Sequence, residues 1–265
     1  MRFALAPLRA VLFVLHVFAG LAIVLFVFPL AGLPRRNGIN RRWSRWLVRI
    51  CGARIEVDGE PIPPGIRRAG IEAAGLGRLV VSNHISWIDV FAINAVTPCR
   101  FVAKAEIGEW PLLGPLVTRS GTLYIERGRR HAVAAMNHIV RERLKAGETI
   151  ALFPEGTTTD GRTLLPFHSN LLAPAVEIGA PVWPLAVSYT EDGVRSDAAA
   201  FVGEMSIVSS LVRILTARRL TVRITVLPTI EVTLHENRHA VACVARESIA
   251  EVLGMAGQER ESPAG

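Results

Sequence analysis

Cysteine is scarce in this 265-residue sequence, and its three cysteines, Cys51, Cys99 and Cys243, lie far apart with no C-x-x-C pair. This pattern argues against a disulfide framework and a cysteine-based zinc site, and it fits a reducing compartment. His16, His138 and His168 have no metal-ligand spacing among them, so we assign them no role, and we expect no bound metal and no cofactor. A G-x-S-x-G segment is also missing, so the sequence does not indicate a serine nucleophile.

Residues 1–50 contain no acidic residue and no lysine, although they contain eight arginines. This segment therefore carries +8, whereas the whole chain has a formal net charge of +7. The rest of the chain is nearly neutral, and a nearly neutral body argues against nucleic-acid binding. A basic segment beside an apolar one instead favours the anionic headgroups of membrane lipids.

Polar residues are almost missing from Ala10 to Leu33, and a helix of about 20 apolar residues can cross the hydrocarbon core of a bilayer. The run is too long for a typical signal peptide, and no convincing cleavage site precedes the basic stretch. Arginines follow at once with Trp43 and Trp46 among them, which is typical of a membrane interface. The positive-inside rule predicts that the rest of the protein lies on the cytoplasmic side of the cell membrane. Gly20 and Pro29 could each break the helix, so spanning and monotopic insertion both stay open.

The remaining sequence alternates short apolar runs with helical patterns, which indicates an α/β fold with a central mixed sheet flanked by helices. The predicted strands run from Leu79 to Ser82, Arg100 to Ala103, Thr122 to Glu126, Thr149 to Phe153 and Val182 to Ser188, with an edge strand from Thr221 to Leu227. The predicted helices run from Ile88 to Val96, His131 to Ala146 and His239 to Met255.

The expected domains are a membrane anchor with its basic connector over residues 1–50, a main domain over residues 51–255 and a flexible tail over residues 256–265. A stretch rich in proline, glycine and charge, from Pro61 to Gly77, is expected to separate the anchor from the core.

Polar segments follow four of the predicted strands, namely Asn83-His84, Lys104, Arg127 and Glu155-Gly156-Thr157. In open α/β sheets the carboxyl ends of the strands border the ligand site. We therefore expect one site to be assembled from all four segments.

The segment NHISWIDV, residues 83–90, places His84 five residues before Asp89. On a regular helix the two side chains would lie about 140° apart around the axis and could not meet. At a strand-to-helix turn, Asp89 can accept the imidazole N–H and leave the other ring nitrogen free as a base for a substrate hydroxyl. The alternative is a structural histidine whose neighbour Asp89 only caps the helix, and the bare pair does not decide between the two.

NHISWIDV resembles the H-x-x-x-x-D motif of the glycerolipid acyltransferases related to bacterial lysophosphatidate acyltransferase, which include lyso-ornithine lipid acyltransferases. Three further segments are similar to that family's later motifs, namely GTLYIER at residues 121–127, FPEGTTT at 153–159 and VWPLAV at 182–187. Order and spacing agree over roughly residues 75–190, and four ordered motifs are far more specific than one.

The resemblance implies that residues 51–255 form an acyltransferase domain. Such a domain transfers an acyl chain from an acyl-CoA or acyl-carrier-protein thioester to the free hydroxyl of a lysolipid. The first expectation for the acceptor is 1-acyl-glycerol-3-phosphate, which becomes phosphatidate. His84 would be the general base and Asp89 would orient it, with no covalent acyl-enzyme.

The resemblance also implies an acceptor site. Arg127, with Lys104 nearby, would hold an anionic headgroup; alternatively Arg127 only starts the next helix or joins the solvated basic run around it. Gly156 permits close backbone approach to a ligand. Glu155 would help to shape the site, and Thr157 belongs to the same segment.

One position departs from the family pattern, because Thr158 stands where the third motif usually has an arginine. A cation associated with the phosphate region is therefore missing, and phosphate specificity stays open. Either Arg162 reaches back from the next turn, or the acceptor carries another headgroup, as lyso-ornithine lipid does.

Two other classes of protein compete with a transferase. A non-catalytic membrane-binding or scaffold protein could retain this fold, although the presence of both His84 and Asp89 does not favour it. A lipid hydrolase would need a nucleophile or a metal, which the sequence does not indicate, and it would release free fatty acid without an acceptor.

Overall fold

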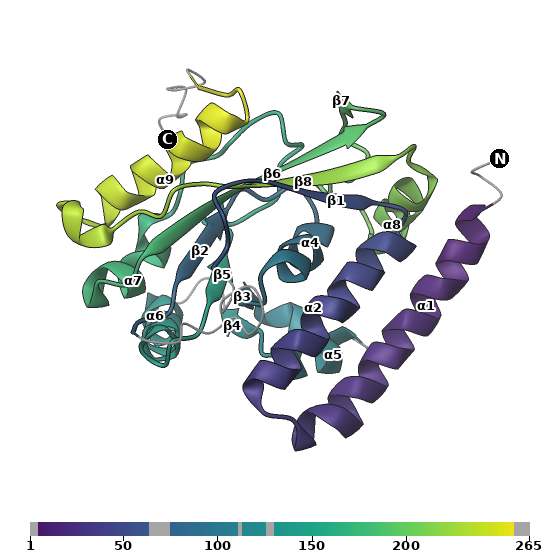
Figure 1. Ribbon diagram of the computed structural model, residues 1–265, viewed down its shortest axis with the longest axis horizontal. Coiled ribbons are helices and arrows are strands. Elements are labelled where there is room, and N and C mark those ends of the chain that lie inside the picture. The colour runs from purple at the N-terminus through teal and green to yellow at the C-terminus, as the bar shows by residue number, and fades with distance from the viewer. Residues whose placement is uncertain (1–4, 64–74, 111–112, 126–129, 257–265) are drawn as a thin grey trace.

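The computed structural model describes residues 5–63, 75–110, 113–125 and 130–256. Its centre is a mixed sheet with the strand order β1-β8-β6-β2-β5-β3-β4, and a short strand β7 pairs with β6. The strands are β1 (Arg54–Gly59), β2 (Leu79–Ser82), β3 (Arg100–Lys104), β4 (Leu123–Ile125), β5 (Ile150–Leu152), β6 (Val182–Glu191), β7 (Val194–Arg195) and β8 (Leu220–Val226). The predicted central mixed sheet is therefore confirmed (Figure 1).

Strand β2 lies inside the sheet between β5 and β6 and runs parallel to both. Strands β3 and β4 continue the sheet beyond β5 in the same direction. Because parallel strands end at the same side of a sheet, the chain leaves β2, β3, β4, β5 and β6 at one common edge, called here the carboxyl edge. Strand β8 runs antiparallel to β6, and β1 runs parallel to β8.

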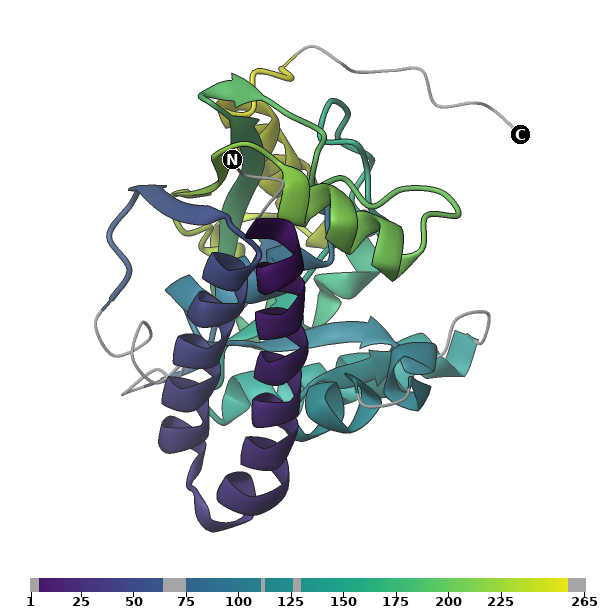
Figure 2. The same ribbon diagram turned by 90° about the vertical axis from the view of Figure 1, so that its right-hand side faces the viewer.

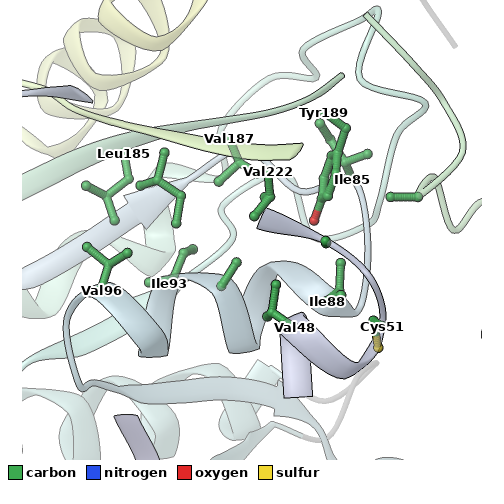
Figure 3. Close-up of a cluster of buried hydrophobic side chains, with 14 of the residues drawn as sticks. Val48, Cys51, Ile85, Ile88, Ile93, Val96, Leu185, Val187, Tyr189 and Val222 are labelled. Carbon is green, nitrogen blue, oxygen red and sulfur yellow. The ribbon is translucent and has the colours of Figure 1, made fainter. Parts of the chain in front are cut away.

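Helices cover both faces of the sheet (Figure 1). The helices on one face are α2 (Leu33–Ile50), α4 (Ile88–Val96) and α8 (Ile207–Thr216), and those on the other are α6 (Arg130–Lys145), α7 (Ala173–Ile178) and α9 (Arg238–Val252). Strand residues alternate between the two faces, so Val80 packs in the first core and Leu79 and Val81 pack in the second. Figure 3 shows the first core, where side chains of α4 meet those of β6 and β8.

An apolar helix precedes this core and packs against it. It begins as α1 (Ala6–Ala22), continues through a π-helical turn (Ile23–Val27) and ends in a 3-10 turn (Phe28–Leu30), before α2 returns antiparallel to it. Gly20 does not break this helix, whereas Pro29 lies in its last turn. By length and composition it could cross a membrane, and it is the one such helix among the described residues.

Helices α1 and α2 are joined by specific polar contacts. The rings of His16 and Trp43 stack with centroids 4.7 Å apart. His16 Nε2 lies 2.9 Å from the Trp43 carbonyl, and the Trp43 indole N–H donates to the His16 carbonyl at 3.1 Å. Gly20 faces the same indole and leaves no room for a β-carbon. The apolar helix therefore lies along a helix rich in arginine.

The structure corrects one strand prediction and adds elements that the sequence pattern did not predict. The strand predicted at an edge, β8, lies between β1 and β6, and the unpredicted β1 occupies the edge instead. Strand β1 is largely exposed, and its few apolar residues alternate with charged ones, so it lacks the apolar run that would predict a strand. The unpredicted elements also include α5 (Leu113–Arg119), α7, α8 and β7. Most of the expected separator, residues 64–74, and the tail, residues 257–265, lie outside the described residues.

Candidate active site

The structure brings His84 and Asp89 together at the carboxyl end of β2. The chain turns directly after Ser82, and Asp89 lies in the first turn of α4, so the two side chains meet across the turn. His84 Nδ1 lies 2.9 Å from Asp89 Oδ2. An ionised carboxylate can only accept, so the shared proton lies on Nδ1. The Nε2 nitrogen is then the basic one, and 18% of the His84 side chain is exposed.

Asp89 is completely buried, and four donors surround its carboxylate. Besides the imidazole, the backbone N–H groups of Ile85 and Ser86 donate to Oδ2 at 2.7 and 2.8 Å. The Tyr189 hydroxyl donates to Oδ1. These bonds compensate for burial of the carboxylate and fix both of its oxygens. Asp89 therefore does more than cap the start of α4.

Tyr189 is a site residue that the sequence analysis missed. It lies on β6, one hundred residues after Asp89, and its ring descends from that strand toward the start of α4 (Figure 3). Burial, together with the neighbouring carboxylate, raises the pKa of the Tyr189 hydroxyl well above its ordinary value, so it remains a donor. The available signal was its register, because Tyr189 shares a strand face with buried Leu185 and Val187 and a buried hydroxyl needs a partner.

His84 is held from the β5 side as well. Its imidazole stacks on the ring of Phe153, with centroids 3.7 Å apart and planes 6° from parallel. Its backbone N–H donates to Glu155 Oε1 at 2.8 Å, and its carbonyl accepts from the Thr159 N–H at 2.8 Å. The FPEGTTT segment after β5 therefore braces the imidazole and the backbone of His84.

A second clamp joins the same turn to β6. The buried side chain of Asn83 donates to the Val187 carbonyl at 2.9 Å and accepts from the Val187 N–H at 2.7 Å. These two bonds replace strand pairing at the point where β2 has ended. Three strands thus contribute to holding the histidine: β2 carries it, β5 leads into the segment beneath it, and β6 fixes its neighbours.

Glu155 is buried, and both of its carboxylate oxygens accept backbone N–H groups. One bond comes from His84, and the other comes from Leu165 at 2.9 Å. Burial raises the pKa of Glu155 to about 7, although these two donors oppose the shift. Glu155 shapes the site by joining two loops. Next to it, Gly156 has a left-handed φ of 72°, which favours glycine, and Thr157 is exposed.

One of the two predicted headgroup cations, Lys104, lies among the described residues. Lys104 ends β3 and is exposed, and it lies opposite Ile125, the last residue of β4. Arg127 lies outside the described residues. Because β3 and β4 are parallel, the last described residue of β4, Ile125, lies at the same edge as Lys104.

Thr158, which stands where an arginine was expected, makes an internal contact instead. Its hydroxyl donates to the Phe201 carbonyl, and the Phe201 N–H donates to the Ile85 carbonyl at 2.9 Å. The segment before α8 is therefore bonded both to the turn after β2 and to the FPEGTTT segment after β5. Arg162 is exposed, and its backbone N–H donates to Asp160.

This arrangement can remove a proton from a bound hydroxyl. An oriented imidazole with a fixed tautomer is a competent general base when a substrate hydroxyl lies within hydrogen-bond reach of Nε2. Among the described residues, neither a serine hydroxyl nor a cysteine thiol bonds to His84 or Asp89, because Ser86 contributes only its backbone N–H. The chemistry that fits is direct attack by the substrate hydroxyl.

Comparison with known proteins gives consistent matches. A family model described as Acyltransferase matches residues 54–188. A lyso-ornithine lipid O-acyltransferase from Pseudomonas aeruginosa is 40% identical over 194 residues, which are 73% of this chain and 70% of that protein. A 1-acyl-sn-glycerol-3-phosphate acyltransferase from Neisseria meningitidis is 35% identical over 177 residues, which are 67% of this chain and 69% of that protein.

A solved structure also matches along the whole length. The crystal structure of the 1-acyl-sn-glycerophosphate acyltransferase PlsC from Thermotoga maritima aligns with a TM-score of 0.69 and 19% sequence identity. The alignment covers 99% of this chain and 100% of that chain. At this identity the likeness shows the fold alone, and it includes the N-terminal helices.

Proposed function

Because this chain belongs to the acyltransferase family, which acts on lysolipids, we propose that it acylates the free hydroxyl of 1-acyl-glycerol-3-phosphate, with His84 as the general base. The observation that carries the proposal is the pair formed by His84 Nδ1 and Asp89 Oδ2, 2.9 Å apart at the carboxyl edge. The reaction would convert a one-chain lipid into phosphatidate. The family and the geometry of the His84–Asp89 pair both support acyl transfer to a hydroxyl.

The proposed reaction is a direct transfer in two proton movements. His84 Nε2 takes the proton from the acceptor hydroxyl as the oxygen attacks the thioester carbonyl. A carbon–oxygen bond forms, and the resulting tetrahedral oxyanion collapses with cleavage of the carbon–sulfur bond. The imidazolium then returns its proton to the leaving thiolate. Asp89 stabilises the imidazolium between these steps without taking up the proton itself.

The donor is proposed to be a soluble thioester, either acyl-CoA or acyl-carrier protein. Both carry the same reacting group, a fatty acyl thioester, so the chemistry at His84 does not distinguish between them. The two donors differ in the surface that binds the carrier, and an experiment with each donor is needed to choose.

A phosphate-bearing acceptor is favoured by the cations predicted at the carboxyl edge. Lys104 ends β3, and Arg127 follows the neighbouring parallel strand β4. A lysine and an arginine together suit a phosphate group, since a lysine offers a point charge and an arginine offers paired donors.

A second candidate acceptor is lyso-ornithine lipid, and the side chain of Thr158 is the observation that favours it. This position offers a neutral hydroxyl, which already donates to the Phe201 carbonyl. A headgroup with both an ammonium and a carboxylate needs less positive charge than a phosphate does. The relative with 40% identity is named for this acceptor.

We further propose that α1 anchors the protein on the cytoplasmic side of the membrane without crossing it alone. The bonds between His16 and Trp43 fix α1 to α2, whose arginines suit lipid headgroups rather than the hydrocarbon core. The outward face of α1 exposes large apolar side chains, including Leu15 and Phe18. A lysolipid and its two-chain product can then stay in the bilayer. Extracting either lipid into water would cost about 0.8 kcal/mol for each CH₂ of its acyl chains.

The test is acyl transfer by the purified full chain in lipid vesicles. Labelled acyl-CoA and acyl-carrier protein are each offered with lysophosphatidate and with lyso-ornithine lipid. The variant His84→Ala is expected to lower transfer by about 10²- to 10⁴-fold. The variant His138→Ala, which removes an exposed histidine on α6, is the matched control and should retain full activity.

The outcomes separate the competing functions. Product from lysophosphatidate that depends on His84 supports the proposal, and product from lyso-ornithine lipid alone supports the second candidate. Full activity in His84→Ala removes the proposed base. Release of free fatty acid without an acceptor indicates a hydrolase. A folded, vesicle-bound protein that acylates neither acceptor with either donor supports a non-catalytic membrane protein.

A further inference from the structure

Helix α8 carries a pair of exposed apolar side chains. Val208 is 71% exposed and Val212 is 53% exposed, one helical turn apart on the same side. The side of α8 turned away from Val208 contributes Ile214 to the buried interior, and Leu215 near the end of the helix is buried as well. The helix therefore has two apolar sides, and the protein core covers only one of them.

Helix α8 adjoins the apolar anchor. Helices α1 and α8 lie side by side at the front of Figure 2, and in Figure 1 α8 again lies next to the start of α1. The guanidinium of Arg9 on α1 donates to the carbonyl of Leu215 near the end of α8 at 3.3 Å. Both neighbouring helices expose large apolar side chains, namely Leu8 and Val11 on α1 and Val208 and Val212 on α8.

Both helices also contact the turn that carries the catalytic pair. The indole N–H of Trp87 donates to the hydroxyl of Ser210 on α8 at 3.0 Å. The Trp87 ring lies edge-to-face with Phe13 of α1, with centroids 6.1 Å apart. Trp87 follows His84 by three residues in the same turn. The surface shared by α1 and α8 therefore lies directly beside the site.

We propose that α8 is a second membrane contact, which inserts Val208 and Val212 into the lipid bilayer beside α1. The inference rests on the proposed membrane anchoring by α1, and it extends that anchoring to the helix next to the catalytic turn. The occupant is the bilayer because α8 lies beside α1, which belongs to the one described helix that is long and apolar enough to cross a membrane.

The charges at the end of α8 support a lipid surface. Arg218 and Arg219 follow the helix with strongly exposed side chains, and both lie near the carboxylate of Asp192. Glu191 is a second carboxylate at this end and accepts the Arg218 backbone N–H, while Arg9 of α1 brings a third arginine to the Leu215 carbonyl. Three arginines against two carboxylates leave one positive charge beside the exposed valines. An apolar face with a basic end is typical of an interfacial helix on anionic lipid.

The consequence for function is a defined depth for the catalytic turn. With contacts on α1 and α8, the bilayer surface meets the protein on both sides of Trp87. A lysolipid can then reach His84 by lateral movement, while its acyl chain stays among other lipids. A single anchor at α1 would leave the protein free to tilt about that helix.

Nitroxide labels test the contact directly. Cys51 and Cys99 are buried, so replacing the exposed Cys243 by serine leaves a background in which single new cysteines can be labelled. Labels are placed at Val208→Cys and Val212→Cys on α8. The matched control is Leu234→Cys, because Leu234 is also an exposed apolar residue, at 81%, but lies in a 3-10 turn (Val232–Leu234) away from α8.

On vesicles of phosphatidylethanolamine and phosphatidylglycerol, labels at positions 208 and 212 should become more accessible to oxygen and less accessible to a nickel chelate. The label at position 234 should remain accessible to the nickel chelate. If positions 208 and 212 behave like position 234, the proposal is overturned. Spin–spin broadening at position 208 without vesicles would instead indicate a second copy of this chain. A label at Val14→Cys on α1 reports anchoring itself, so its failure to enter lipid counts against the anchor.

A kinetic experiment adds a functional measurement. The double variant Val208→Asp/Val212→Asp should acylate a lysolipid embedded in vesicles at least roughly tenfold more slowly, since carboxylates disfavour insertion. Its rate with a short-chain, water-soluble lysolipid should stay at the wild-type level. The control Leu234→Asp should leave both rates unchanged. Equal loss with both acceptors would contradict a membrane role, and no transfer by the wild-type protein would count against the proposed function instead.

Discussion

The carboxyl edge and the outward surface of α1 and α8 satisfy their side chains in opposite ways. At the carboxyl edge Asp89 is fully buried with four donors, and Glu155 is buried with two. On the outward surface, Leu15 of α1 is 59% exposed and Val208 of α8 is 71% exposed. Polar groups at the carboxyl edge thus find partners inside the protein, whereas these apolar groups are left for the lipid contacts proposed above. The edge needs no membrane to satisfy its side chains, but the outward surface would need one.

The most damaging change to the carboxyl edge is expected to be Asp89→Asn. The asparagine side chain has the same shape as the aspartate, but its NH₂ group faces N–H donors. The substitution also removes the negative charge that orients His84. Transfer should fall by about 10²- to 10⁴-fold, and thermal stability should fall as well. The control Asp160→Asn changes a carboxylate that accepts a single backbone N–H in a loop, and both measurements should stay near wild type. Normal kinetics in Asp89→Asn would mean that His84 does not depend on this partner.

The pH dependence of stability tests the buried Glu155. Its pKa in the folded protein is about 7, above the ordinary value of 4.5, so the folded state binds the proton more tightly than the unfolded state does. The stabilisation is fully present below pH 4.5 and is lost as the pH rises through 7, with a total of about 3 kcal/mol. Unfolding of wild type and Glu155→Gln is measured from pH 4 to 8, and only the wild type should lose this amount. A parallel pH dependence in both proteins would assign the effect to other groups, and Glu204→Gln, at an exposed site, is the control.

The variant Tyr189→Phe removes one donor from Asp89 and keeps the aromatic ring. We expect kcat to fall about tenfold with little change in acceptor KM, since one hydrogen bond to a charged group is lost. The carboxylate, with one donor fewer, should hold the imidazolium more strongly and move the acidic limb of the pH–rate profile to higher pH. Tyr124→Phe is the matched control, because the only other tyrosine bonds to Thr118 at an exposed site. A slower rate with an unchanged pH profile would indicate a purely structural role for Tyr189.

The smallest expected effect is at the junction of α1 and α2. A β-carbon at Gly20 would lie 2.7 Å from the Trp43 indole nitrogen, whereas one at Gly38 on α2 would have nothing within 4 Å. Gly20→Ala should therefore lower the free energy of unfolding by about 1 kcal/mol, and Gly38→Ala should raise it by up to about 1 kcal/mol. Thermal unfolding in detergent measures both. Equal effects at the two positions would mean that α1 packs on α2 less tightly than this structure has it.

The elements around the catalytic turn could be predicted because their sequence signals are local. Strand β2 and helix α4 have the bounds that the apolar pattern predicts. Strand β1 was missed because it is held by pairing with β8 rather than by apolar side chains of its own. The same cause made β8 look like an edge strand. Pairing partners far apart in sequence leave no local pattern.

The partners of the candidate site residues were the harder part. Tyr189 lies in an apolar strand, so its hydroxyl bond to Asp89 depends on the sheet register rather than on any motif. Glu155 belongs to a motif that suggested acceptor contacts, but its two oxygens are engaged by the backbone of His84 and Leu165. Thr158 was interpreted only as the absence of an arginine. Its bond to the Phe201 carbonyl could not be predicted, because Phe201 lies 43 positions further along the chain.

The flat stacking of His84 on Phe153 restricts the direction from which a hydroxyl can react. The lone pair of Nε2 lies in the plane of the imidazole. Stacking on Phe153 fixes the orientation of that plane, and the bond from Nδ1 to Asp89 prevents the ring from turning within it. An acceptor hydroxyl must therefore arrive edge-on, along a line parallel to the phenyl ring beneath. An acceptor with two hydroxyls could present only one of them along this line. Regioselectivity would then follow from the orientation of a single ring, without a separate group to recognise the position that is acylated.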